Sequence, residues 1–69
     1  MNVEDIILNF LNEQTKFSGI FPYPVEIEYI QNELDISDIK LNIAISNLIK
    51  KNIVRYRFIG NTAIELVSK

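Results

Sequence analysis

Residues 34–54 read LDISDIKLNIAISNLIKKNIV, and the order of secondary-structure elements in the fold can be predicted outward from this stretch. Ser37 is suited to cap a helix, because its hydroxyl can accept a hydrogen bond from a backbone N–H of the first turn. The helix should run over residues 38–51, where two lysines favour the negative end of its dipole. Asn52 follows, and asparagine tolerates the left-handed backbone conformation that ends many helices. The stretch therefore predicts a tight turn, a helix and a second sharp turn.

The predicted helix over residues 38–51 has two faces of different character. At about 100° per residue, three aliphatic side chains fall within about 60° of one another. These core candidates are Leu41, Ile45 and Leu48. The opposite side carries Ile39, Ile43, Ser46, Asn47 and Lys50, with Lys40 and Asn42 on the two flanks. The first face should pack on a core, and the second should meet solvent or a partner.

Two further helices are expected earlier in the chain. Asn2 can cap the first, over residues 3–15, where apolar side chains recur at helical spacing. The second is expected over residues 25–34, with Pro24 suited to its first turn. Both patterns leave one apolar face for a shared core.

The segment between these helices, residues 17–25, reads FSGIFPYPV. One glycine and two prolines rule out a continuous helix. Its apolar and aromatic side chains are many for a free loop: Phe17, Ile20, Phe21 and Tyr23. We expect a short extended piece packed on the core, because aromatic side chains dominate the burial available to a small domain. The alternative is an aromatic contact surface.

The hydrophobic period changes from helical to alternating at residue 53, which predicts a β-hairpin over residues 53–67. A two-residue turn at Gly60 and Asn61 would mix apolar and charged groups on one face. A three-residue loop, over residues 59–61 or 60–62, gathers the apolar side chains on one side. These are Val54, Tyr56, Phe58, Ile64 and Leu66. Since a slip of one residue inverts the faces, burial favours the longer loop.

The charged residues are distributed unevenly along the chain. Residues 1–38 contain eight acidic residues and one basic residue, whereas residues 39–64 contain five basic residues and no acidic one. Such polarity can mark a nucleic-acid face on an otherwise acidic protein, although small proteins also segregate charge by chance. Arg55 and Arg57 should share the less apolar face of the hairpin, where Glu65 can pair with one of them.

The composition excludes several classes of protein. With 69 residues, of which 48% are hydrophobic, the chain should form a single domain over residues 1–69. It has no cysteine and no histidine, so we expect no disulfide framework, no zinc site and no His-dependent catalysis. Without a Gly-rich phosphate loop or a matched carboxylate pair, we expect no enzyme, no cofactor and no small-molecule ligand. The N-terminus does not resemble a signal peptide, and no apolar run approaches the ~20 residues of a membrane span, which favours a cytoplasmic protein.

The order of helix, extended piece, helix, tight turn, helix and β-hairpin resembles the winged-helix variant of helix-turn-helix domains. Residues 34–54 carry most of the resemblance, since several of their side chains fall on that family's core and cap positions. These are Leu34, Ile36, Ser37, Leu41, Ile45, Leu48, Ile53 and Val54. Asp35 and Asn52 stand where the family prefers glycine, and Gln31 replaces a residue that is usually small. The resemblance implies an α+β fold in which a three-helix helix-turn-helix core is followed by a C-terminal two-stranded β-hairpin, the wing.

The resemblance also implies double-stranded DNA as the commonest partner of such a domain. We therefore expect a small sequence-specific transcriptional regulator, acting as a dimer because a lone module of this size makes few base contacts. Asparagine can read adenine edges, lysine can contact guanine or phosphate, and the wing arginines can contact phosphates. The candidate DNA-binding residues are Lys40, Asn42, Ile43, Ser46, Asn47, Lys50, Lys51, Arg55 and Arg57.

Two features of the same helix point in another direction. Asp38 stands at its start, close to where a DNA phosphate would pass, and Ile39 and Ile43 form an outward apolar ridge. The ridge has three open interpretations: abundant isoleucine without function, contact with thymine methyl groups, or a protein or self-association surface. The last makes Ile39 and Ile43 candidates for a protein interface. The alternative function is a non-catalytic winged-helix accessory subunit that docks on a protein of the transcription or replication machinery.

Overall fold

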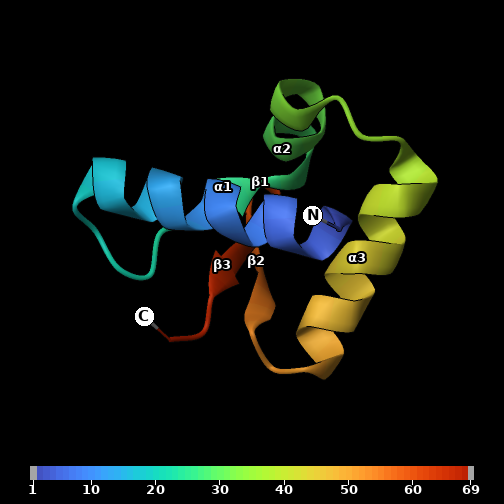
Figure 1. Ribbon diagram of the computed structural model, residues 1–69. Coiled ribbons are helices and arrows are strands. Elements are labelled where there is room, and N and C mark those ends of the chain that lie inside the picture. The colour runs from blue at the N-terminus through green and yellow to red at the C-terminus, as the bar shows by residue number, and fades with distance from the viewer. Residues whose placement is uncertain (1, 69) are drawn as a thin grey trace.

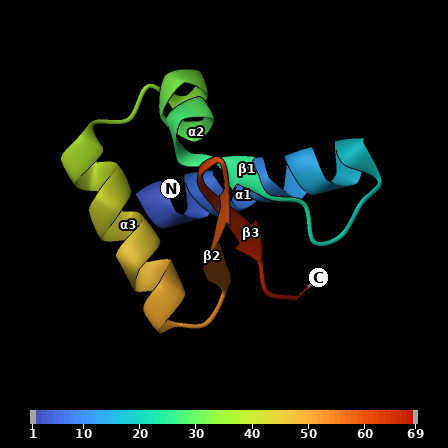
Figure 2. The same cartoon turned by 180° about the vertical axis from the view of Figure 1, so that it is seen from behind.

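The computed structural model describes residues 2–68, except the side chain of Ile59. Over this range three helices and a three-stranded antiparallel sheet form an α+β fold. The elements are α1 (Val3–Ser18), β1 (Val25–Glu26), α2 (Ile27–Leu34), α3 (Asp38–Lys50), β2 (Val54–Ile59) and β3 (Asn61–Leu66). Figure 1 shows α1 crossing in front of the sheet, and Figure 2 shows the hairpin of β2 and β3 from the other side. This layout is compatible with a winged helix.

α1 begins where the sequence indicates and ends later. The side chain of Asn2 accepts a hydrogen bond from the backbone N–H of Asp5, as expected of a helix cap. The helix continues past residue 15 to Ser18, and Gly19 ends it in the left-handed conformation at φ 72°. Left-handed backbone suits glycine because it has no Cβ to clash. The helix therefore ends just before Gly19 and not at residue 15 as predicted.

The expectation that residues 17–25 contain a short extended piece packed on the core holds in part, because α1 takes up the first two of these residues. Phe17 lies on the last turn of α1 and is 95% exposed, and Ile20 is 59% exposed. Only Phe21 and Tyr23 pack against the core. The helix carries Phe17 outward because its buried residues, Ile7 and Leu11, lie on a different face.

The predicted helix over residues 25–34 starts two residues late, at Ile27, because Val25 and Glu26 form strand β1. β1 pairs with β3, with Val25 opposite Ile64 and Glu26 opposite Ala63. The sheet thus has three strands in the order β1-β3-β2, not the two expected of the hairpin alone. Pairing satisfies backbone groups of Val25 while burying its side chain to 4% exposure, which a surface helix start would not do.

The turns around α3 follow the prediction. The hydroxyl of Ser37 accepts a hydrogen bond from the backbone N–H of Lys40, and Asp35 and Asn52 adopt positive φ angles of 51° and 60°. The helix ends at Lys50, one residue earlier than expected. Its buried residues are Leu41, Ala44, Ile45 and Leu48. The predicted core stripe is confirmed, and Ala44 widens it toward α1.

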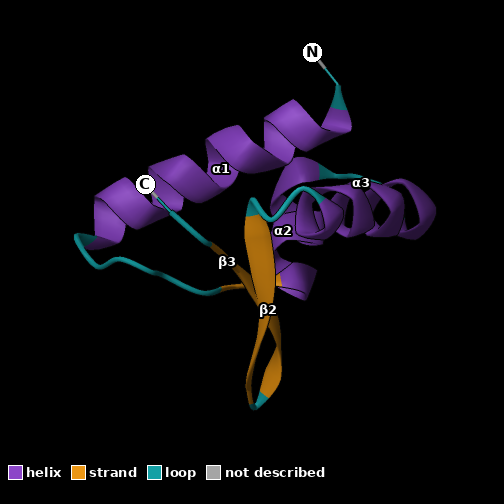
Figure 3. Ribbon diagram, turned by 90° about the horizontal axis from the view of Figure 1, so that it is seen from below, coloured by secondary structure: helices purple, strands orange, loops and turns teal. Residues whose placement is uncertain are grey.

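The hairpin has the register of the 59–61 loop, with Tyr56 opposite Ile64 and Phe58 opposite Thr62. Pairing continues to Ile59 and Asn61, so Gly60 alone remains at the tip, at φ 79°. Val54, Ile64 and Leu66 are buried as expected, but Tyr56 and Phe58 are 45% and 76% exposed. Figure 3 shows the hairpin projecting beyond the helices, which leaves Tyr56 and Phe58 largely outside the core.

Candidate interaction surface on the third helix and the wing

The outward face of α3 is where the sequence places it. Ile39 is 74% exposed and Ile43 is 58% exposed, while Leu41, Ala44 and Ile45 beside them are almost fully buried. The remaining exposed side chains of the helix are polar, basic or, at its start, acidic: Asp38, Lys40, Asn42, Ser46 and Lys50. The two isoleucines are about 40° apart around the helix and one turn apart along it, so they form a continuous apolar ridge.

Ile43 also lines a shallow hollow between α3 and the start of α1. The hollow has a volume of about 300 Å³. Its lining residues are Asn2, Val3, Glu4, Lys40, Ile43, Ala44 and Asn47. The ridge therefore extends into a depression that an apolar side chain of a partner can enter, rather than standing on a flat helix.

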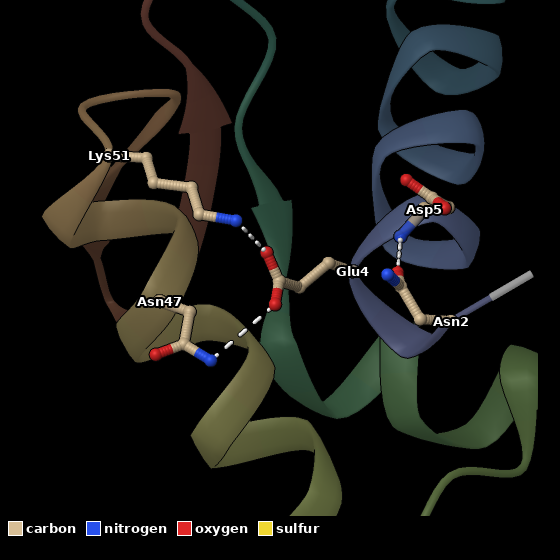
Figure 4. Close-up of polar contacts among 5 residues, drawn as sticks. All are labelled: Asn2, Glu4, Asp5, Asn47 and Lys51. Atoms are coloured by element: carbon tan, nitrogen blue, oxygen red, sulfur yellow. Dashed lines mark hydrogen bonds and ion pairs between the residues drawn. The ribbon is translucent and has the colours of Figure 1, made fainter.

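One flank of this face is occupied by Glu4 of α1. Glu4 accepts hydrogen bonds from Lys51 Nζ to Oε1 at 2.7 Å and from Asn47 Nδ2 to Oε2 at 3.4 Å, as Figure 4 shows. Two of the candidate DNA-binding residues are thus engaged by a carboxylate within the chain. In the sequence, Glu4 is one of the eight acidic residues of residues 1–38, and it lies in the first turn of α1. No local pattern links it to residues more than 40 positions away.

Lys51 holds the pKa of the Glu4 carboxyl below its ordinary value, chiefly through the hydrogen bond and also through its charge. Partial burial of the carboxylate opposes this effect, and the hydrogen bond from Asn47 adds to it. A carboxyl whose pKa is lowered by folding stabilises the folded state above its unfolded pKa. The stabilisation is lost as pH falls through the lowered folded pKa.

Glu4→Gln is therefore expected to lower stability at neutral pH and to have a diminishing effect below about pH 4.3, the ordinary pKa of glutamate. Urea unfolding of both proteins across the acid range measures the difference. Asp5→Asn is the matched control, since Asp5 is a neighbouring exposed acid of the same helical turn, whereas Glu4 is the acid that accepts the hydrogen bonds from Lys51 and Asn47. A stability difference that stays constant with pH would show that the Glu4 charge does not link α1 to α3.

The hairpin of β2 and β3 has a second carboxylate cluster. Glu65 is fully buried, and its Oε2 lies 2.6 Å from Arg55 Nε while its Oε1 lies 3.5 Å from Arg57 Nε. The Arg55 contact is a hydrogen bond, whereas Oε1 receives none among the described residues. The sequence indicated one arginine partner for Glu65, and the structure places both beside it. Both arginines remain about half exposed.

Three of the five candidate basic residues are thus close to a carboxylate of the chain. Among residues 2–68, no ion pair involves Lys40 or Lys50. Asp38, at the start of α3, accepts a hydrogen bond from Gln31 of α2. Gln31 therefore ties α2 to α3.

The wing adds an aromatic pair that sequence reasoning assigned to the core. Tyr56 and Phe58 stack with their ring centroids 6.1 Å apart and their planes 25° apart. Strand alternation explains why the two side chains share a face, but only the projecting hairpin leaves them accessible. Together the ridge and this pair form two exposed apolar areas, one on α3 and one on β2.

No family model, curated protein or solved structure matches this chain. Within the described range, no helix is both long and apolar enough to span a bilayer. The same residues contain no group of three or more potential metal-ligating His, Cys, Asp or Glu side chains.

Proposed function

We propose that this protein is a non-catalytic docking module with a winged-helix layout, and that it presents the outer face of α3 to a protein partner. The observation that carries the proposal is the exposed Ile39–Ile43 ridge beside the apolar hollow. The winged-helix resemblance makes a protein of the transcription or replication machinery the first kind of partner to test. An enzyme is not part of this proposal, because the sequence has neither histidine nor cysteine.

Apolar burial supplies the free energy for such a contact. Fully burying an isoleucine side chain contributes about 1.5–3 kcal/mol, and a partner side chain in the hollow adds its own burial. Lys40 and Lys50 border the ridge and can form the polar rim that surrounds the apolar centre of many interfaces. The chain is acidic overall, with a net charge of −2. A net charge of this size does not favour general binding to phosphates, but it does not prevent phosphates from binding to the basic groups of this face.

Sequence-specific binding of DNA as a dimer is the second candidate function. It is supported by the exposure of Lys40, Asn42, Ser46 and Lys50 on one side of α3. It is weakened by the engagement of Lys51 and Asn47 with Glu4, and of the wing arginines with Glu65. If these contacts break when DNA binds, their loss offsets part of the free energy gained from the new contacts with phosphates.

Ile39→Ser combined with Ile43→Ser is expected to abolish capture of the partner while changing folding stability by no more than about 0.5 kcal/mol. Quantitative affinity capture from cells that express the protein, with urea unfolding in parallel, measures both effects. Phe17→Ser combined with Ile20→Ser is the matched control, because it also removes two exposed apolar side chains, but at the far end of α1. Equal capture by both double variants would exclude the ridge as the contact.

Binding to random duplex DNA at two salt concentrations separates the two candidate functions. A DNA-binding protein should lose about 0.9 log unit of affinity per log unit of salt for each phosphate neutralised. Lys40→Gln combined with Lys50→Gln should then reduce that slope by up to the contribution of two neutralised phosphates. The variant with both ridge isoleucines replaced by serine should alter only the preference among DNA sequences. The absence of DNA binding at low salt would remove this second candidate.

A further inference from the structure

Strand β2 is an open edge of the sheet. The strand order is β1-β3-β2, so over residues 2–68 β2 has a strand neighbour on one side only. Figure 3 shows its outer half projecting away from the helices, where none of them covers it. An edge strand presents unpaired backbone N–H and C=O groups that can pair with another strand. β2 keeps six paired residues without a proline or a bulge, so its edge is regular enough to be extended.

The side chains of β2 differ between its two faces. Tyr56 and Phe58 are exposed on one face, and Arg55 and Arg57 lie on the other. The two guanidinium groups share one carboxylate, that of Glu65. Each guanidinium has five N–H donors, and the structure shows Arg55 using Nε toward Glu65 while Arg57 Nε stays 3.5 Å away. This face of the edge therefore keeps a positive charge and donors that can reach a further carboxylate.

β3 shows which kind of strand β2 accepts on its inner side. There Glu65 lies opposite Arg55, and Ile64 lies opposite Tyr56. An acidic residue on the arginine face and an apolar residue on the aromatic face would repeat this pattern on the open side. Opposite charges and aromatic–aliphatic pairs across strands each contribute roughly 0.2–1 kcal/mol.

We propose that the open edge of β2 binds an extended segment of a partner protein in which acidic residues alternate with apolar ones. The segment adds to the sheet as a fourth strand beside β2. Its carboxylates meet Arg55 and Arg57, and its apolar side chains cover Tyr56 and Phe58. Backbone hydrogen bonds supply affinity in this mode of recognition, and alternate side chains supply specificity.

A second copy of the chain fits this edge less well than an acidic segment. Antiparallel pairing of two β2 strands in one continuous sheet would place the arginines of both copies on the same face. Four guanidinium groups would then share two buried carboxylates, and like charges across strands are destabilising. The arginines thus act against self-pairing while favouring an acidic strand. This site is separate from the ridge on α3, so the proposal does not depend on the function proposed above.

Synthetic seven-residue peptides test the proposal with the whole chain. The probe alternates glutamate with isoleucine, a second peptide replaces each glutamate by lysine, and a third carries N-methyl groups on alternate backbone nitrogens. Fluorescence anisotropy measures affinity, and amide chemical shifts report which residues are contacted. We expect the glutamate peptide to bind, with shifts concentrated in residues 54–59, and each modified peptide to bind at least about tenfold more weakly.

Two variants assign the binding to β2. Arg57→Gln is expected to lower the affinity for the glutamate peptide about tenfold. This variant retains the hydrogen bond between Arg55 and Glu65. Ile39→Ser with Ile43→Ser should bind the peptide normally, which keeps this result distinct from the ridge experiment. Absence of binding, or binding that N-methylation does not affect, would overturn the proposal. Concentration-dependent self-association that protects the amides of residues 54–59 would overturn it as well, in favour of a second copy.

Discussion

Arg55→Ala combined with Arg57→Ala is expected to lower the free energy of unfolding by about 3–5 kcal/mol. Glu65 is fully buried, and these two arginines are the basic side chains that lie within ion-pair distance of it among the described residues. Their removal leaves a buried carboxylate without compensation, which costs far more than the loss of two surface charges. Urea unfolding followed by circular dichroism measures the change.

Glu65→Leu in the same background is the control for this mechanism. A leucine in place of the buried carboxylate removes the unpaired charge, so the triple variant should regain most of the lost stability. If the double arginine variant loses less than about 0.5 kcal/mol of unfolding free energy, neither arginine is required to stabilise the buried carboxylate of Glu65. The same contacts make alanine variants of these arginines unsuitable for measuring phosphate contacts, because any effect on DNA would be mixed with unfolding.

Leu41→Ala is expected to cost about 2–5 kcal/mol of stability, from lost apolar burial and the cavity that remains. Leu41 is 1% exposed and belongs to the cluster that joins α1, α3 and the sheet. At roughly 0.05–0.15 kcal/mol per residue, a domain of this size has only about 3–10 kcal/mol in total, so the variant should be close to unfolding at 37 °C. The midpoint of thermal unfolding checks this directly.

Ile39→Ala is the matched control, because it removes a similar aliphatic side chain from the same helix at a position that is 74% exposed. Its effect should stay within about 0.5 kcal/mol, apart from small differences in helix propensity. Comparable losses for the two variants would mean that the rotation of α3 is wrong, and with it the assignment of the ridge.

The elements that could be predicted are those whose signal is local. The rotation of α3 follows from the spacing of Leu41, Ile45 and Leu48, because a helix of 3.6 residues per turn places them on one face wherever it packs. Ser37 and Asn52 mark its ends through capping and a left-handed turn, which depend on neighbouring backbone groups alone. The hairpin register follows from the alternation of Val54, Ile64 and Leu66, because a slip of one residue between the strands would place Val54 on the opposite face from Ile64 and Leu66.

Other features depend on how far the helices extend over the sheet. Tyr56 and Phe58 share a face with Val54, but the hairpin projects beyond α1 and α3, so alternation predicts burial that the packing does not provide. β1 has two residues, too few for any periodicity, and it exists because β3 lies beside it. Phe17 belongs to a helix that continues to Ser18, and its face meets solvent instead of the core.

The charged residues of the candidate site show most clearly which features the sequence predicts and which depend on the packing. Residue order alone separates an acidic first half from a basic stretch over residues 39–64, and it identifies the side chains that can face outward. It does not reveal that Glu4 reaches Lys51 and Asn47 across more than 40 residues, or that Glu65 serves two arginines rather than one. Helical and strand periods are set by each residue's own backbone, and so they can be read in order along the chain. Neutralisation of a charge requires a partner within about 4 Å, and in a folded chain that distance is set by the packing of α1 against α3 and of β2 against β3.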